Sequence, residues 1–226
     1  MKIKSHSINI IFLILLFAIF SDASVNKEKT PVLLNSYFPI NDDETLIFNS
    51  SFGESITKYF QDDDMTISSS EADDFKYRQA LIIKEDGVYI IETYQYIKIF
   101  LFINEEATST YGKPLLRFPL PLIPGEEWEW EGDEYSDGDT NKVKVTGKVL
   151  GKEFITTEAG RFESIKIESL VEGSSDLKNR VTEWYVEGIG LIKVKAIIEG
   201  GGIMGFVRDL MGYGVIEFEL KEIRNQ

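Results

Sequence analysis

The sequence predicts an all-β protein, built as a single antiparallel barrel, half-barrel or strongly curved sheet of about 10–12 strands. Short runs rich in Val, Ile, Phe, Tyr and Thr recur from residue 46 to the C-terminus, with Gly, Asn and Asp between them. Several of these runs alternate apolar and polar residues, as half-buried strands do. The chain has 226 residues, of which 43% are hydrophobic, and this is ample for one packed β domain.

The N-terminus resembles a secretory signal peptide. Two lysines precede the apolar stretch from Ile8 to Phe20, and Ser21 and Ala23 supply the small residues of a cleavage site. The stretch is shorter than the about 20 apolar residues that a membrane-spanning helix needs. We therefore expect residues 1–23 to be a cleaved signal peptide and the protein to be exported, either to the periplasm or out of the cell. No stable membrane span would remain after cleavage, and a retained N-terminal anchor is the alternative.

A flexible lead-in and one β domain are expected after the leader. Residues 24–44 are polar, contain Pro31 and Pro39, and end in an acidic run, which is typical of irregular structure. The antiparallel β domain is expected over residues 45–226. Its first strands are predicted at residues 46–48, 55–60 and 75–84.

The next segments predict a hairpin followed by a buried strand. Asp86-Gly87 separates two β-rich runs and predicts a tight turn, because Gly accepts a positive φ and Asp tolerates it. Residues 97–103 are almost continuously apolar and rich in β-branched and aromatic side chains. This composition favours a strand buried on both faces.

Proline-rich, aromatic and acidic segments follow one another in the middle of the chain. Three prolines within residues 115–125 exclude a central strand, so this segment is expected to cross the sheet or form an edge. Glu and Trp alternate from residue 126, which places Trp128 and Trp130 on one face of a strand. Residues 131–141 are acidic and contain Gly, and they predict a loop.

The second half predicts a meander with a turn at residues 150–152. Its strands are expected at residues 142–146, 154–157, 162–170, 180–186, 191–198 and 214–223. Gly200–Gly214 is glycine-rich at both ends and apolar between, with residues 203–210 as the one candidate for a short helix. The segment is either a mobile apolar flap over a cavity or a plug of the barrel end, and we favour the plug.

Composition excludes several classes of function. The only His is His6, inside the expected leader, and the chain has no Cys. Catalysis by Ser-His-Asp or Cys-His groups and His- or Cys-ligated metal sites are therefore excluded from the mature protein. Without the leader the chain has 22 basic and 37 acidic side chains, a net charge of −15. Such a charge disfavours binding to nucleic acid. The sequence predicts no cofactor and assigns no catalytic residue.

Two sets of residues are candidates for binding sites. An apolar ligand would contact aromatic and Met side chains, and the candidates are Trp128, Trp130, Met204, Phe206 and Met211. An irregular calcium site is the second candidate, with oxygen ligands from Asp133, Asp137 and Asp139. The helix-loop-helix calcium motif is excluded, because Tyr135 and Lys144 occupy positions where that motif needs oxygen ligands.

Carboxylate chemistry is the enzymatic alternative. Glycoside hydrolysis needs two well-placed acids, and six acidic residues lie near the two tryptophans, whose rings stack well on sugars. They are Glu126, Glu127, Glu129, Glu131, Asp133 and Glu134. A strand with a solvated acidic face and an aromatic core face gives the same pattern, and we favour this interpretation.

Several segments resemble motifs of uncharacterised bacterial envelope β proteins of the domain-of-unknown-function type, which are placed near TapB-like β folds. The resemblance covers residues 118–223 and rests on turn glycines and strand aromatics. The segments that carry it are Phe118–Trp130, Val145–Phe162, Glu183–Lys193 and Phe218–Leu220.

The resemblance implies roles in the fold but no activity and no catalytic residues. Gly160 and Gly190 fit tight turns, and Phe162 and Trp184 fit the core. This chain has Glu158 where the family usually has Pro, a departure that concerns the type of turn.

The sequence therefore favours an exported, non-enzymatic binding module for an apolar small molecule or a protein partner of the cell envelope. Two alternatives stay open: a carboxylate-dependent, glycan-active enzyme, and a structural or adhesive envelope component. The identity of the ligand and the oligomeric state are left open.

Overall fold

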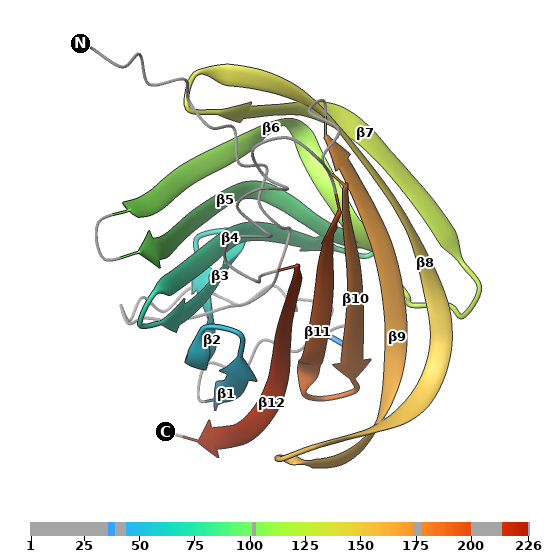
Figure 1. The fold of residues 1–226 in the computed structure, drawn as a ribbon. Helices are drawn as coiled ribbons and strands as arrows, with labels where there is room; N and C mark the ends of the chain where they lie inside the picture. The colour runs from blue at the N-terminus through green and yellow to red at the C-terminus, as the bar shows by residue number, and fades with distance from the viewer. Residues whose placement is uncertain (1–35, 39–43, 101–102, 174–177, 200–213, 226) are drawn as a thin grey trace.

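The described part of the chain contains twelve strands, and each pairs antiparallel with its neighbours in a closed barrel (Figure 1). The computed structural model describes residues 36–38, 44–100, 103–173, 178–199 and 214–225. The strands are β1 Glu44–Ser50, β2 Gly53–Asp62, β3 Met65–Ala72, β4 Phe75–Lys84, β5 Gly87–Phe100, β6 Ile103–Pro119, β7 Glu127–Ser136, β8 Asp139–Thr157, β9 Gly160–Gly173, β10 Lys178–Val186, β11 Gly190–Glu199 and β12 Val215–Asn225. The predicted all-β fold class is confirmed.

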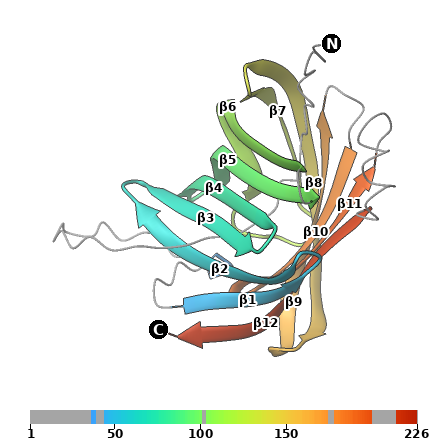
Figure 2. The ribbon, with the colours of Figure 1, turned by 60° about the vertical axis from the view of Figure 1, so that its left-hand side comes forward.

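The barrel closes where the first strand meets the last. β1 pairs with β2 on one edge and with β12 on the other, from Glu44↔Asn225 to Ser50↔Phe218 (Figure 2). β-Bulges interrupt several ladders, among them one opposite Ile47/Phe48, where Lys221 is the extra residue on β12. Bulges increase the local twist and bend the strand, which helps a long sheet to curve round on itself. Within the described residues no helix is long and apolar enough to cross a membrane.

The predicted hairpin at Asp86-Gly87 is present, but its turn lies one residue earlier. Lys84 pairs with Gly87, so the turn is made by Glu85 and Asp86. Gly87 has no positive φ, and a Cβ atom there would lie 2.7 Å from Cδ1 of Leu116. Close packing against the neighbouring strand therefore explains this glycine.

The prediction of one doubly buried strand over residues 97–103 is wrong. β5 ends at Phe100 and β6 begins at Ile103, and the register pairs these two residues with each other. Lys98 is exposed and forms an ion pair with Asp74. The apolar run covers the ends of two antiparallel strands, and apolar content alone does not reveal such a reversal.

Two predicted irregular segments are also strand. The expected loop at residues 131–141 is a tight hairpin, in which Asp137 (φ 51°) and Gly138 (φ 86°) form the turn between β7 and β8. Two successive positive φ angles are typical of the type I′ turn, which Asp-Gly favours. The expected turn at residues 150–152 is a bulge within β8 at Val149/Gly151, so β8 continues to Thr157.

β6 and β7 separate after a short ladder of three pairs, from Ser109↔Ser136 to Tyr111↔Glu134. Beyond Tyr111, β6 pairs with β5 alone, and residues 120–126 then lead from the end of β6 past β8 into β7. This segment is held at both ends, because Leu120 donates its N–H to the Asp86 carbonyl and Gly125 donates to the Val149 carbonyl. The proline-rich segment thus forms an edge, as predicted.

The barrel interior has a polar and an apolar side. The inner face of β2, β3 and β4 carries buried polar side chains, namely Ser55, Thr57, Ser68, Ser70 and Gln79. The inner faces of β8 to β12 are mostly apolar, although Glu183 of β10 is a buried charge there, and include Val143, Val145, Val149, Ile165, Ile167, Val171, Val181, Val194, Ala196, Ile198, Ile216, Phe218 and Leu220. Inside the barrel, a polar group therefore has possible partners on β2 to β4 and at Glu183 of β10.

Candidate functional site

The two tryptophans of β7 lie on the inner face of the barrel wall. Trp128 and Trp130 are 8% and 6% exposed. A Cβ atom added to Gly147 would lie 2.2 Å from the Trp128 ring, so this glycine makes room for the indole. The Trp130 Nε1 donates to the Pro114 carbonyl at 3.0 Å, across the gap where β6 and β7 have separated. Both indole rings are therefore packed against neighbouring strands of the barrel and are not available as an open binding surface.

The acids beside these tryptophans lie mostly on the opposite, outer face. Glu127 pairs with Lys148 at 2.5 Å, and Glu129 pairs with Lys144 at 2.9 Å. The hydrogen bond from Lys148 lowers the pKa of Glu127. A sugar that contacted these acids would meet little of the tryptophan rings, which are at most 8% exposed, so stacking of a sugar on these rings is disfavoured.

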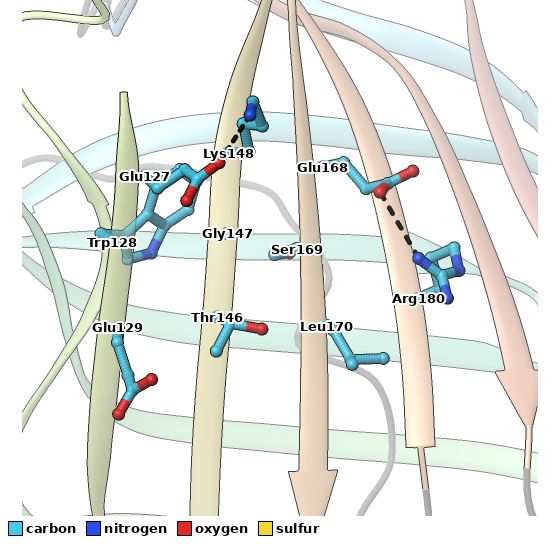
Figure 3. Close-up of a pocket in the computed structure, with 10 residues that line it drawn as sticks. All are labelled: Glu127, Trp128, Glu129, Thr146, Gly147, Lys148, Glu168, Ser169, Leu170 and Arg180. Atoms are coloured by element: carbon cyan, nitrogen blue, oxygen red, sulfur yellow. Dashed lines mark hydrogen bonds and ion pairs between the residues drawn. The ribbon is translucent and has the colours of Figure 1, made fainter. Parts of the chain in front are cut away.

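A shallow depression of about 500 Å³ covers the outer wall from β7 to β10 (Figure 3). Two ion pairs cross it, Glu127–Lys148 and Arg180–Glu168, the latter at 3.4 Å. Its lining residues are Glu127, Trp128, Glu129, Thr146, Gly147, Lys148, Glu168, Ser169, Leu170 and Arg180. Acidic and basic groups are paired across the depression, so its charge selects neither an anion nor a cation.

The three aspartates of the calcium hypothesis lie at the β7–β8 hairpin. Asp133 is within β7 and forms an ion pair with Lys142 at 2.6 Å, Asp137 is in the turn, and Asp139 begins β8. Across the described residues, no group of three or more His, Cys, Asp or Glu side chains is placed to hold a metal ion. The remaining ligand candidates, Met204, Phe206 and Met211, and the helix candidate at residues 203–210 lie outside the described residues.

A buried polar cluster centred on Arg117 spans the interior. Arg117 Nη2 lies 2.6 Å from Glu183 Oε1, and the two side chains are 3% and 5% exposed. Nη2 also donates to the Tyr185 hydroxyl at 2.8 Å, and Nη1 donates to Gln79 Oε1 at 3.2 Å. The Tyr185 hydroxyl in turn donates to Glu183 at 3.1 Å. The cluster connects β4, β6 and β10, which are not adjacent in the sheet.

Charge and burial act together on this cluster. Burial alone would lower the pKa of Arg117, but Tyr185 and Glu183 outweigh it and the net pKa is raised. Burial raises the pKa of Tyr59 to about 12, although the nearby Arg117 charge opposes the shift. Burial also raises the pKa of Tyr185 well above its usual range. At neutral pH the cluster therefore holds a charged guanidinium and two neutral phenols.

Phe38 lies beside this cluster, although it belongs to no strand. Its side chain is 3% exposed, and its ring centroid is 5.5 Å from that of Tyr59 in an edge-to-face contact and 6.2 Å from that of Phe118. The Arg117 guanidinium carbon lies 5.4 Å from the Phe118 ring. The segment 36–38 is held at Ser36, whose carbonyl accepts the Gly188 N–H at 2.6 Å. This part of the expected flexible lead-in thus packs into the barrel.

The sequence analysis missed Arg117, Glu183 and Phe38. The sequence does contain a pattern that could have identified the first two, because each is a single charged residue among residues that face the core. Arg117 interrupts an apolar run, and Glu183 falls at the inward positions of its strand, between Val181 and Tyr185. The sequence contains no comparable pattern for Phe38. Its burial depends on how a segment that belongs to no strand packs against the barrel.

Residues 134–205 match the family model described as DUF3108-like. This confirms the resemblance to uncharacterised β proteins of the domain-of-unknown-function type. The matched DUF3108-like region contains Glu183 and Tyr185, whereas Arg117 and Phe38 precede it. No curated protein matches the chain at a significant level.

Three solved structures are similar to this chain. A protein described as a lipoprotein from Parabacteroides distasonis is 12% identical, with 84% of this chain and 99% of that chain covered and a TM-score of 0.40. A protein described as exported, with a YmcC-like fold, from Bacteroides fragilis is 13% identical, with 84% and 100% covered and a TM-score of 0.43. The hypothetical lipoprotein YmcC from Escherichia coli is 11% identical, with 79% and 83% covered and a TM-score of 0.42.

Proposed function

We propose that this protein is an exported, non-enzymatic binding module whose barrel takes up the apolar part of a small molecule. The binding place is the pocket that the Phe38 ring fills. One observation carries the proposal: Phe38 lies outside every strand, yet its ring is buried between Tyr59 and Phe118. The barrel therefore has an apolar surface that is covered by a side chain from outside the sheet.

A ligand would replace the Phe38 ring at a moderate cost. Re-exposing a buried Phe side chain costs about 1.5–3 kcal/mol. An apolar ligand of similar or larger size recovers that free energy when it is buried in the same place. The segment that carries Phe38 is held by the Ser36–Gly188 backbone hydrogen bond, so its displacement breaks no strand ladder.

Export is supported by the sequence alone. The leader-like residues 1–23 fit a protein that works outside the cytoplasm. The competing structural or adhesive role, and a role in binding a protein partner, both predict no saturable uptake of a small apolar molecule.

Binding of N-phenyl-1-naphthylamine, an uncharged fluorophore that brightens in apolar surroundings, tests the proposal. Protein purified after expression of the full-length chain should bind it saturably at one site. The Phe38→Ala variant should bind at least about tenfold more tightly, because no ring has to be displaced. Phe154→Ala is the matched control, since Phe154 is 61% exposed on β8 and its removal should leave the affinity unchanged.

Two results would count against the proposal. Linear, non-saturating fluorescence in both the unsubstituted protein and Phe38→Ala would mean that the barrel takes up no apolar molecule. Equal affinity in the two proteins would mean that the fluorophore binds elsewhere. Far-ultraviolet circular dichroism of each variant checks that the sheet is retained.

A further inference from the structure

We infer that the bound molecule carries an uncharged carbonyl oxygen, as an ester or amide does, and that this oxygen accepts a hydrogen bond from Arg117 Nε. The inference rests on the proposed function and specifies the polar end of the ligand. The reason is that some hydrogen-bond donors of the Arg117 cluster already have acceptors within the protein, whereas one does not.

One nitrogen of the Arg117 guanidinium has no acceptor. Nη1 and Nη2 are both engaged, with Gln79, Glu183 and Tyr185, but Nε is buried without a hydrogen-bond partner. Buried donors are almost always paired in native proteins, since an unpaired one loses its hydration and gains nothing. The Nε–H group therefore marks a position where an acceptor is expected.

A second unpaired group lies on the same side of the barrel. The Ser68 side chain is 1% exposed and its Oγ has no partner. Ser68 is the direct cross-strand neighbour of Gln79, which accepts a hydrogen bond from Arg117, and of Tyr59, which contacts Phe38. The polar end of a molecule whose apolar part replaces Phe38 would therefore meet this region.

The acceptor is uncharged because the charge of Arg117 is already balanced. Glu183 lies 2.6 Å from the guanidinium, and Arg117 is the only basic side chain among the buried residues that the structure describes. A second carboxylate would be buried near Glu183 with no further cation to balance it, which is strongly unfavourable.

A carbonyl fits better than a hydroxyl. Its oxygen has two lone pairs and brings no donor of its own, so it can accept from Arg117 Nε without adding a proton that needs a partner. A hydroxyl group would add a proton that needs another buried acceptor.

Displacement of N-phenyl-1-naphthylamine by three straight-chain compounds tests this inference at pH 8. They share a ten-carbon chain: methyl decanoate and decyl methyl ether have eleven carbons with the methyl group, and the ether lacks the carbonyl, whereas ionised decanoate has ten. The unsubstituted protein should bind the ester at least about tenfold more tightly than the ether, as expected for a hydrogen bond from a charged donor. It should bind decanoate more weakly than the ester.

The Arg117→Met/Glu183→Gln double variant removes the donor and leaves no unpaired charge. In this variant the preference for the ester over the ether should fall to about onefold to twofold, since the hydrogen bond to a charged donor is gone. The control is Lys195→Met/Glu217→Gln, the same change at an outer ion pair of 2.8 Å, which should keep the full preference.

The outcomes separate this inference from the proposed function. If the fluorophore binds saturably but ester and ether compete equally, the carbonyl inference is wrong and the binding function stands. If decanoate competes best, the site recognises charge and the inference is likewise wrong. If the fluorophore does not bind to the unsubstituted protein or to Phe38→Ala, the proposed function itself fails.

Discussion

Removing Arg117 while leaving Glu183 in place should be one of the most destabilising single changes in the barrel. In the Arg117→Met variant, the Glu183 carboxylate would stay 5% exposed without its cation, which now lies 2.6 Å away. Breaking a buried ion pair by removing one partner costs about 3–5 kcal/mol. Domains of this kind have a total stability of about 5–15 kcal/mol, so the variant should still fold but with a large loss.

The double variant Arg117→Met/Glu183→Gln separates the charge effect from the loss of packing. It removes both charges, and the amide oxygen of the introduced glutamine can still accept the hydrogen bond that the Tyr185 hydroxyl donates to Glu183. Replacing a buried pair with uncharged groups is often close to neutral, so we expect the double variant to recover most of the lost stability. Lys195→Met, which breaks a pair whose side chains are 42% and 49% exposed, should cost less than about 1 kcal/mol.

Urea unfolding followed by tryptophan fluorescence measures these differences. With a urea dependence of about 3 kcal/mol per molar, the single variant should unfold at a midpoint about 1–2 M lower. The difference in unfolding free energy between the unsubstituted protein and the single variant should be smaller at pH 5 than at pH 8. An unpaired buried carboxyl has a folded-state pKa above its unfolded one, and its stabilising contribution is lost as pH rises through that range. A deficit below about 1 kcal/mol at pH 8, or a double variant no more stable than the single one, would refute the reasoning.

Three further predictions concern other parts of the chain. Gly147→Ala should destabilise the protein by about 1–3 kcal/mol and shift its tryptophan emission, because the new Cβ would lie 2.2 Å from the Trp128 ring; an unchanged unfolding midpoint would contradict this. Burial raises the pKa of Glu134, so its contribution to stability falls as pH rises above the unfolded-state value. The stability of Glu134→Gln relative to the unsubstituted protein should accordingly increase from pH 4 to pH 7, as measured by urea unfolding at both pH values. A stability difference between the two proteins that is the same at both pH values would contradict this. Intact mass measurement of the exported protein should show cleavage after Ala23, whereas an intact Met1 would contradict the leader.

Much of the barrel could be predicted because alternation is a local property of the sequence. Where one face of a strand meets the core, as along Val143 and Val145, every second residue is apolar and the strand is recognisable. The errors fell where chain reversal depends on one or two residues. The Asp137-Gly138 turn was hidden within an acidic segment, and the reversal between Phe100 and Ile103 was hidden within an apolar one.

The candidate site was less predictable because its residues come from distant strands. Alternation placed Trp128 and Trp130 on one face, but only the closed barrel shows this face to be the inner one. Arg117 and Glu183 are 66 residues apart, and their contact depends on closure of the sheet. Their positions among inward-facing residues were visible in the sequence, whereas their pairing was not.

The pairing of β1 with β12 has a consequence for how the molecule is completed. Every other ladder joins strands that are consecutive in the chain, so each can form as soon as its second strand has been made. β1 must wait for Val215–Asn225, almost the whole length of the polypeptide. Until those residues have been made, the outer edges of the sheet and its apolar inner face are exposed. Other chains can pair with these edges, and such exposure favours aggregation. In a protein that emerges N-terminus first, the barrel therefore closes only after Val215–Asn225 has emerged and can pair with β1.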